Sequence, residues 1–77
     1  MRIYINAVPV DVEQGTDVRG AIRTHDPAME ASAVEGAALV TDARGVELAL
    51  DGPLAAGSIL RVILRARRGE RDVDADA

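Results

Sequence analysis

The sequence has no cysteine, one histidine and one aromatic residue, a tyrosine. Without cysteine there is no disulfide, and a single histidine is a poor start for a metal site that would hold a small fold together. Packing of Ala, Val, Ile and Leu must therefore stabilise the protein. The lack of Phe and Trp also argues against the base-stacking surfaces of nucleic-acid-binding proteins. We expect no metal and no cofactor.

Lysine is absent as well, because all nine basic residues are arginine. Apart from its N-terminus, the chain therefore offers no amine for acylation. Genomic base composition can by itself produce such a bias.

Basic charge is scarce overall, with thirteen acidic residues against nine basic ones, a net charge of −4 and a pI near 4.7. A net negative charge disfavours electrostatic binding to the phosphate backbones of nucleic acids.

No apolar run approaches the roughly 18 residues that cross a bilayer, and the start lacks the pattern of a signal peptide. We expect a cytoplasmic protein that binds neither nucleic acid nor membrane. Its 77 residues leave room for one domain.

Alternating apolar and polar residues predict two strands near the N-terminus, over residues 2–6 and 10–13, joined by a tight hairpin. The alternation sends Ile3 and Ile5 to one face of the first strand and Tyr4 to the other. Pro9 lacks an amide hydrogen and would break the ladder of a central strand, so we expect the second strand at a sheet edge.

A helix is predicted to follow, with Thr16 as its N-cap and Asp17 in its first turn. Arg19 and Arg23 are expected on its solvent side. Its other side carries an apolar stripe at helical spacing, formed by Val18, Ala21, Ile22 and His25.

Asp26 and Pro27 end this helix and have the residue types that begin another, as N-cap and first helical residue. Gly36 is the expected stop. The inner face of this second helix is predicted to be Met29, Ala33 and Val34.

Three further strands are predicted, over residues 38–41, 46–50 and 58–67. The last has apolar residues on both faces, which is typical of a central strand. Strand parity and helix spacing together predict a core of Ile3, Ile5, Val10, Val12, Val18, Ile22, Leu60 and Val62. Residues 69–77 are polar, acidic and without apolar periodicity, so we expect one domain over residues 1–68 and a disordered tail after it.

This order of strands and helices is that of the β-grasp fold, and short motifs strengthen the comparison. Residues 5–16, Ile-Asn-Ala-Val-Pro-Val-Asp-Val-Glu-Gln-Gly-Thr, resemble the opening of the thiamine and molybdopterin sulfur-carrier proteins, with Ala7 in place of the usual turn glycine. Residues 54–62 resemble the approach to the last strand in the same families, and residues 60–69 are similar in pattern to the end of ubiquitin. The resemblance implies an α+β, ubiquitin-like β-grasp domain. Its mixed sheet would have four or five strands in the order 2-1-5-3-4, with one main helix on one face.

The resemblance also implies chemistry at the C-terminus. Ubiquitin-like modifiers and sulfur carriers end in Gly-Gly, which threads a narrow channel and presents its carboxylate for adenylation by an E1-like enzyme. Here the matching pair is Arg68-Gly69, and eight residues follow it. We therefore expect either a peptidase that trims the chain after Gly69, before an E1-like partner activates it for transfer to protein targets, or a non-conjugated interaction module of the same fold.

Two surfaces are candidates for binding a partner protein. Tyr4 and Ile63, with either Leu39 or Val40, can form an apolar patch on the open face of the sheet, although ordinary surface packing explains them equally. Basic residues near the end of the last strand, which solubility and edge protection also explain, can dock on an acidic partner. They are Arg61, Arg65, Arg67 and Arg68.

Catalysis is not expected, and we predict that the chain is not an enzyme. His25 has no nearby cysteine and no clear carboxylate partner, so it is interpreted as a residue at a helix end. Ser32 and Ser58 lack a histidine–acid pair, and the spacing around Gly15 and Gly20 is not that of a phosphate-binding loop.

Overall fold

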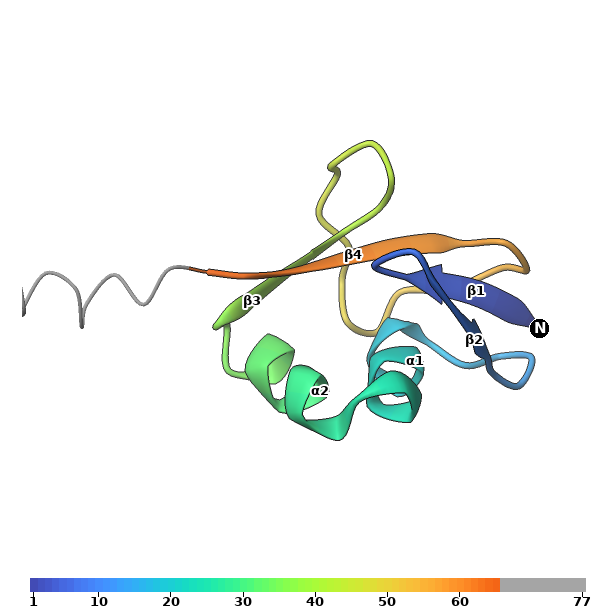
Figure 1. Ribbon diagram of the computed structural model, residues 1–77, viewed down its shortest axis with the longest axis horizontal. Coiled ribbons are helices and arrows are strands. Elements are labelled where there is room, and N and C mark those ends of the chain that lie inside the picture. The colour runs from blue at the N-terminus through green and yellow to red at the C-terminus, as the bar shows by residue number, and fades with distance from the viewer. Residues whose placement is uncertain (66–77) are drawn as a thin grey trace, which may run out of the picture.

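A computed structural model describes residues 1–65, which form one sheet with two helices on one of its sides (Figure 1). The α+β class predicted from the sequence is therefore confirmed. No helix in this part of the chain is long and apolar enough to cross a membrane. The elements are β1 (Arg2–Ile5), β2 (Val8–Asp11), α1 (Val18–His25), α2 (Pro27–Val34), β3 (Ala38–Thr41) and β4 (Ile59–Leu64).

The sheet is mixed, with four strands in the order β2-β1-β4-β3. β1 pairs antiparallel with β2 and parallel with β4, and β3 pairs antiparallel with β4. As predicted, the apolar β4 is central and β2, which contains Pro9, lies at an edge. Because β1 and β4 are neighbours, the beginning and the end of residues 1–65 meet in the middle of the sheet.

The strand predicted over residues 46–50 does not form, so the observed order differs from the expected 2-1-5-3-4: the fourth predicted strand is missing, and the other four stand in the expected order. Among residues 1–65 this segment makes one isolated bridge, between Thr41 and Glu47. The chain then leaves the sheet, because the carbonyls of Leu50 and Gly52 accept hydrogen bonds from the N–H groups of Arg19 and Val18 at 2.8 and 3.1 Å. These donors belong to the first turn of α1, where no intrahelical acceptor is available. The segment thus caps a helix instead of extending the sheet.

Two helices of eight residues each form, as the residues predicted, whereas the resemblance implied one main helix. The N-cap of α1 is Asp17, not Thr16 as predicted, since the Asp17 carboxylate accepts from the Gly20 N–H at 2.8 Å. Asp26 caps α2 as predicted, accepting from the Ala28 N–H at 3.0 Å, and Pro27 follows it. Two successive caps thus divide the helical segment in two.

The core lies between the sheet and the helices, and all eight residues predicted for it are buried. In α2, Ala33 is buried and Met29 packs against the core as expected, but Val34 is 47% exposed. Glu30 takes the inward position instead and is only 8% exposed. The prediction for Val34 is wrong: α2 ends at this residue, and the inward side of the helix is formed by Met29, Glu30 and Ala33.

Glu30 joins the two helices through arginines of α1. Its Oε2 accepts from Arg19 Nε at 2.6 Å and lies 3.5 Å from Arg23 Nη2. The hydrogen bond from Arg19 lowers the pKa of Glu30, assisted by the charge of Arg23 and opposed by burial. Arg19 and Arg23 are exposed as predicted, yet both serve to neutralise one buried carboxylate.

The hairpin between β1 and β2 turns on Asn6 and Ala7, whose φ angles of 52° and 71° are both left-handed. Two such residues make the mirror-image turn that matches the twist of a two-residue hairpin, where glycine is favoured in the second position. An alanine there is held in a conformation that costs roughly 1–2 kcal/mol.

We therefore expect Ala7→Gly to stabilise the protein by about 0.5–1 kcal/mol, since relief of strain exceeds the added flexibility of the unfolded chain. For a domain of this size the melting temperature should rise by a few degrees. The matched control is Ala43→Gly in the turn after β3, because the backbone of Ala43 is not left-handed. An equal gain at both positions would contradict the strain argument.

Candidate functional site

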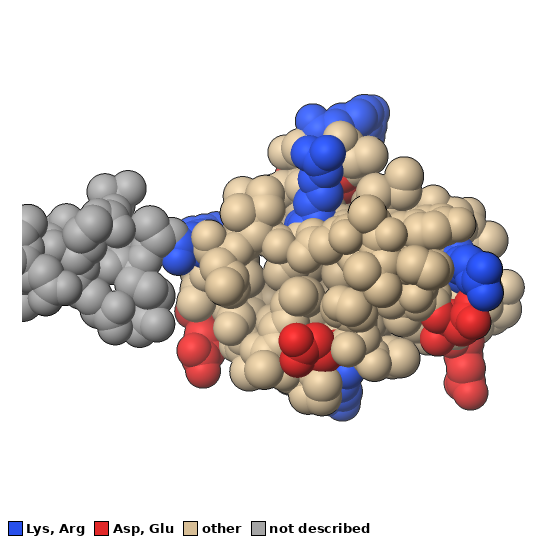
Figure 2. All heavy atoms as spheres, in the orientation of Figure 1, with Lys and Arg blue, Asp and Glu red and all other residues tan. Residues whose placement is uncertain are grey.

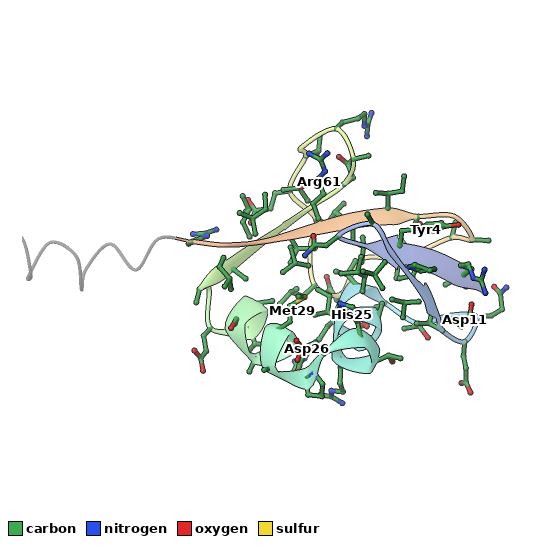
Figure 3. The ribbon with its side chains drawn as sticks, in the orientation of Figure 1. Tyr4, Asp11, His25, Asp26, Met29 and Arg61 are labelled. Carbon is green, nitrogen blue, oxygen red and sulfur yellow. The ribbon has the colours of Figure 1, made fainter. Side chains whose placement is uncertain are left out.

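The open face of the sheet is the side that neither helix covers, and strand alternation decides which residues it carries. In β1, Ile3 and Ile5 point to the helices, so Tyr4 points away from them. In β4, Leu60 and Val62 are buried, and the residues that alternate with them are exposed. Figure 3 shows Arg61 on the side of the sheet opposite Met29, Asp26 and His25.

A shallow groove crosses this face beside the β1–β2 turn. We call it the β4 groove; it is lined by Tyr4, Asn6, Ala7, Ile59, Leu60, Arg61 and Ile63. Its apolar members are partly exposed, at 36% for Tyr4, 46% for Ile59 and 52% for Ile63. Tyr4 and Ile59 are neighbours in the parallel β1–β4 pair. The groove therefore has an apolar floor and one charged side chain, the guanidinium of Arg61.

The structure brings together Tyr4, Arg61 and Ile63, three of the residues singled out from the sequence. Leu39, the ladder partner of Ile63, is the residue that extends the apolar surface on β3. Val40, the other candidate, is buried on the helix side at 4% exposed. Binding of a partner at these residues stays a prediction.

Other predicted site residues do not join the groove. Arg65 lies at a separate hollow with Ala38 and Glu47, because β4 ends at Leu64 and the alternation of the strand ends with it. Arg67, Arg68 and Gly69 lie outside the described residues.

Asn6 is a structural member of the groove that the sequence did not reveal. Its side-chain amide accepts from the Val62 N–H at 2.9 Å and donates to the Val62 carbonyl at 3.2 Å. The Asn6 N–H donates in turn to the Leu60 carbonyl at 3.0 Å. The amide thus acts as one more peptide group of β1, after the strand itself has ended. These bonds hold the hairpin turn against β4 and fix one wall of the groove.

Arg61 supplies the charge of the groove, and no carboxylate within residues 1–65 forms an ion pair with it. The four ion pairs of this part of the chain use other arginines. Asp42 is the acidic residue nearest along β3, since it follows Thr41, the ladder partner of Arg61. Its carboxylate is engaged in its own turn, however, where it accepts from the N–H groups of Val46 and Arg44 at 3.0 and 2.8 Å.

The hydrogen bond from the Val46 N–H has the largest effect on the pKa of Asp42 and lowers it. Burial, the next largest effect, opposes this, and the N–H group and side chain of Arg44 lower the pKa further. The carboxylate therefore stays charged but is directed into the turn. Arg44 also binds it, with Nη2 at 3.1 Å from Oδ2. Arg61 is left as a cation that an acidic group from elsewhere can reach.

The groove is suited to binding rather than to bond-breaking chemistry. Its polar groups are a phenol, an amide already bonded to Val62, and one guanidinium. No group of three or more His, Cys, Asp or Glu side chains within residues 1–65 is arranged to hold a metal ion. Ser58 Oγ accepts from the Ala55 N–H at 3.0 Å and so supports the approach to β4. The arrangement can hold an apolar segment that also carries a carboxylate.

The chain matches no protein-family model, no curated protein and no solved structure. Functional inference therefore depends on the geometry of residues 1–65 and on the motifs of the sequence.

Proposed function

We propose that this chain is a ubiquitin-like β-grasp protein that serves as a protein modifier or sulfur carrier, activated at the carboxylate of Gly69 after a peptidase has removed the residues beyond it. The sheet order β2-β1-β4-β3, with a parallel central pair and helices on one face, supports this fold. An E1-like adenylating enzyme would be the activating partner, and the use of ATP implies a cytoplasmic location.

The observation that carries the proposal is the position of the last strand. β4 lies between β1 and β3, and the last backbone hydrogen bond of the described chain is donated by Arg65 to the Ala37 carbonyl at 2.7 Å. Gly69 is four residues further on, so the chain from this anchor reaches at most about 13 Å when extended. A carboxylate at that distance from a well-anchored strand can enter the channel of an activating enzyme while the domain stays folded.

The activation step needs the freed carboxylate and ATP. A Gly69 carboxylate oxygen attacks the α-phosphorus of ATP, the bond from that phosphorus to the bridging oxygen breaks, and pyrophosphate leaves. A thiolate or sulfide then attacks the acyl carbon, and AMP leaves. Arg68 lies next to the reacting group, so the channel must admit a long cationic side chain and would favour an acidic lining.

Mass spectrometry of the protein from its native cell tests the proposal. We expect a species that ends at Gly69, and this species should gain the mass of an adenylyl group with ATP and the cell's E1-like enzyme. The control is Gly69→Asp in the full chain, which should be neither cut nor adenylated. If the full-length mass is the sole species and Gly69→Asp behaves as the natural chain does in the cell, the modifier hypothesis is wrong.

A non-conjugated interaction module is the second candidate, and the β4 groove is the observation that favours it. Exposed Tyr4, Ile59 and Ile63 around Arg61 form a surface that a partner protein can contact without any reaction at Gly69. This candidate takes the place of the first if the mass measurement fails.

A further inference from the structure

The β4 groove combines two properties that a bound segment can use. Its apolar side chains are exposed, and Arg61 has no carboxylate partner within residues 1–65. In Figure 2 the arginines at the top rise from the side away from the helices, whereas most of the carboxylates in view lie lower. An occupant of the groove should therefore be negatively charged on the side that faces Arg61.

The sequence of this chain contains such a segment. Residues 70–77 are Glu-Arg-Asp-Val-Asp-Ala-Asp-Ala, with four carboxylates and one guanidinium, a net charge of −3. The acids occupy every second position, and Arg71, Val73 and the two alanines stand between them. In an extended conformation, alternate residues point to opposite sides, so one side is acidic and the other carries Arg71 and the small apolar residues.

The segment is long enough to reach the groove. Ile59 lies six residues before Arg65, about 20 Å back along β4. Residues 66–77 follow Arg65 directly and span up to about 40 Å when extended. A reversal within residues 66–69 brings residues 70–77 back along β4, and closing so short a loop costs little entropy. Gly69 tolerates the backbone angles that a tight reversal needs.

We propose that residues 70–77 bind in extended form over the β4 groove, with the side that carries their carboxylates turned toward Arg61. The segment then covers the open face of the sheet in the full-length chain. This binding goes beyond the proposed function and does not require it. If the proposed function also holds, one cut after Gly69 both frees the reactive carboxylate and uncovers the face.

A spin label on the segment tests the binding directly. Because the chain has no cysteine, Ala77→Cys carries a single nitroxide on the otherwise full-length protein, and amide signals near it lose intensity in NMR spectra. We expect a strong loss at Tyr4, Ile59 and Ile63 in low salt, and recovery of these signals in high salt as the charges are screened. Arg61→Glu should abolish the loss, whereas Arg61→Lys, which keeps the charge, should retain it.

Several outcomes would overturn the proposal: signal loss confined to the end of β4, loss on the helix side of the sheet, or loss that persists in Arg61→Glu. Mixing unlabelled isotope-enriched protein with spin-labelled protein identifies contact between two copies, which would also contradict it. A triple change of Asp72, Asp74 and Asp76 to asparagine should weaken the effect without touching the folded domain. No enzyme is present in this experiment, so its failure and the failure of the proposed function are separate results.

Discussion

Leu60→Ala is expected to reduce the free energy of unfolding by about 2–5 kcal/mol, a large part of the roughly 5–15 kcal/mol that holds a small domain together. Leu60 is 1% exposed and lies in the central strand, where it is the ladder neighbour of Ile5 on β1. The core consists of aliphatic side chains and no aromatic one, so the cavity is lined by small groups. Urea unfolding followed by far-ultraviolet circular dichroism measures the loss.

The matched control is Ile63→Ala, three residues further along the same strand and on its other face. Ile63 is 52% exposed, so its truncation removes little buried area and should cost no more than about 1 kcal/mol. Equal losses at the two positions would contradict the assignment of the faces of β4, and with it the position of the β4 groove on the open side.

The faces of the strands could be predicted because alternation is a local property. Alternation assigns Ile3 and Ile5 to the opposite face of β1 from Tyr4. It also assigns Leu60 to the opposite face of β4 from Arg61, and neither assignment requires knowledge of what packs on the sheet. The edge position of β2 followed from the chemistry of Pro9 alone. These local rules are enough to predict most of the core and the residues of the open face.

Errors arose where a distant group decides the outcome. Residues 46–50 alternate as a strand does, but the carbonyl of Leu50 is used by the first turn of α1. Glu30 was not expected to face inward, yet it is buried, because two arginines of the other helix neutralise it. Neither the helix cap nor the ion pair can be recognised from the sequence of the segment whose structure it determines.

The residues of the candidate site likewise fall into two groups: those that local alternation predicts and those whose position depends on distant contacts. Tyr4, Arg61 and Ile63 follow from alternation, and the structure places them at one groove. Arg65 has the right parity but lies beyond the end of β4, at another hollow. The role of Asn6 could not be predicted, because its side-chain partner, Val62, is 56 residues away in the sequence.

Asn6→Ala is therefore the second substitution expected to have a large effect, at about 2–3 kcal/mol of unfolding free energy. Two hydrogen bonds to Val62 are lost, each worth about 1 kcal/mol when its partner stays unsatisfied. The φ angle of 52° adds roughly 1 kcal/mol of strain for an alanine. Chemical unfolding gives the total, and hydrogen exchange at the Val62 amide reports the broken bond locally.

Two further variants separate these contributions. Asn6→Gly accepts the left-handed angle without strain but has no side-chain amide, so it should lose the hydrogen bonds alone and cost less than Asn6→Ala. Asn6→Asp keeps an acceptor for the Val62 N–H and removes the donor to the Val62 carbonyl, so the Val62 amide should stay protected from exchange. If Asn6→Gly were as stable as the natural chain, the side chain would contribute nothing to the attachment of the turn. The wall of the β4 groove would then be set by the backbone bond from Asn6 to the Leu60 carbonyl.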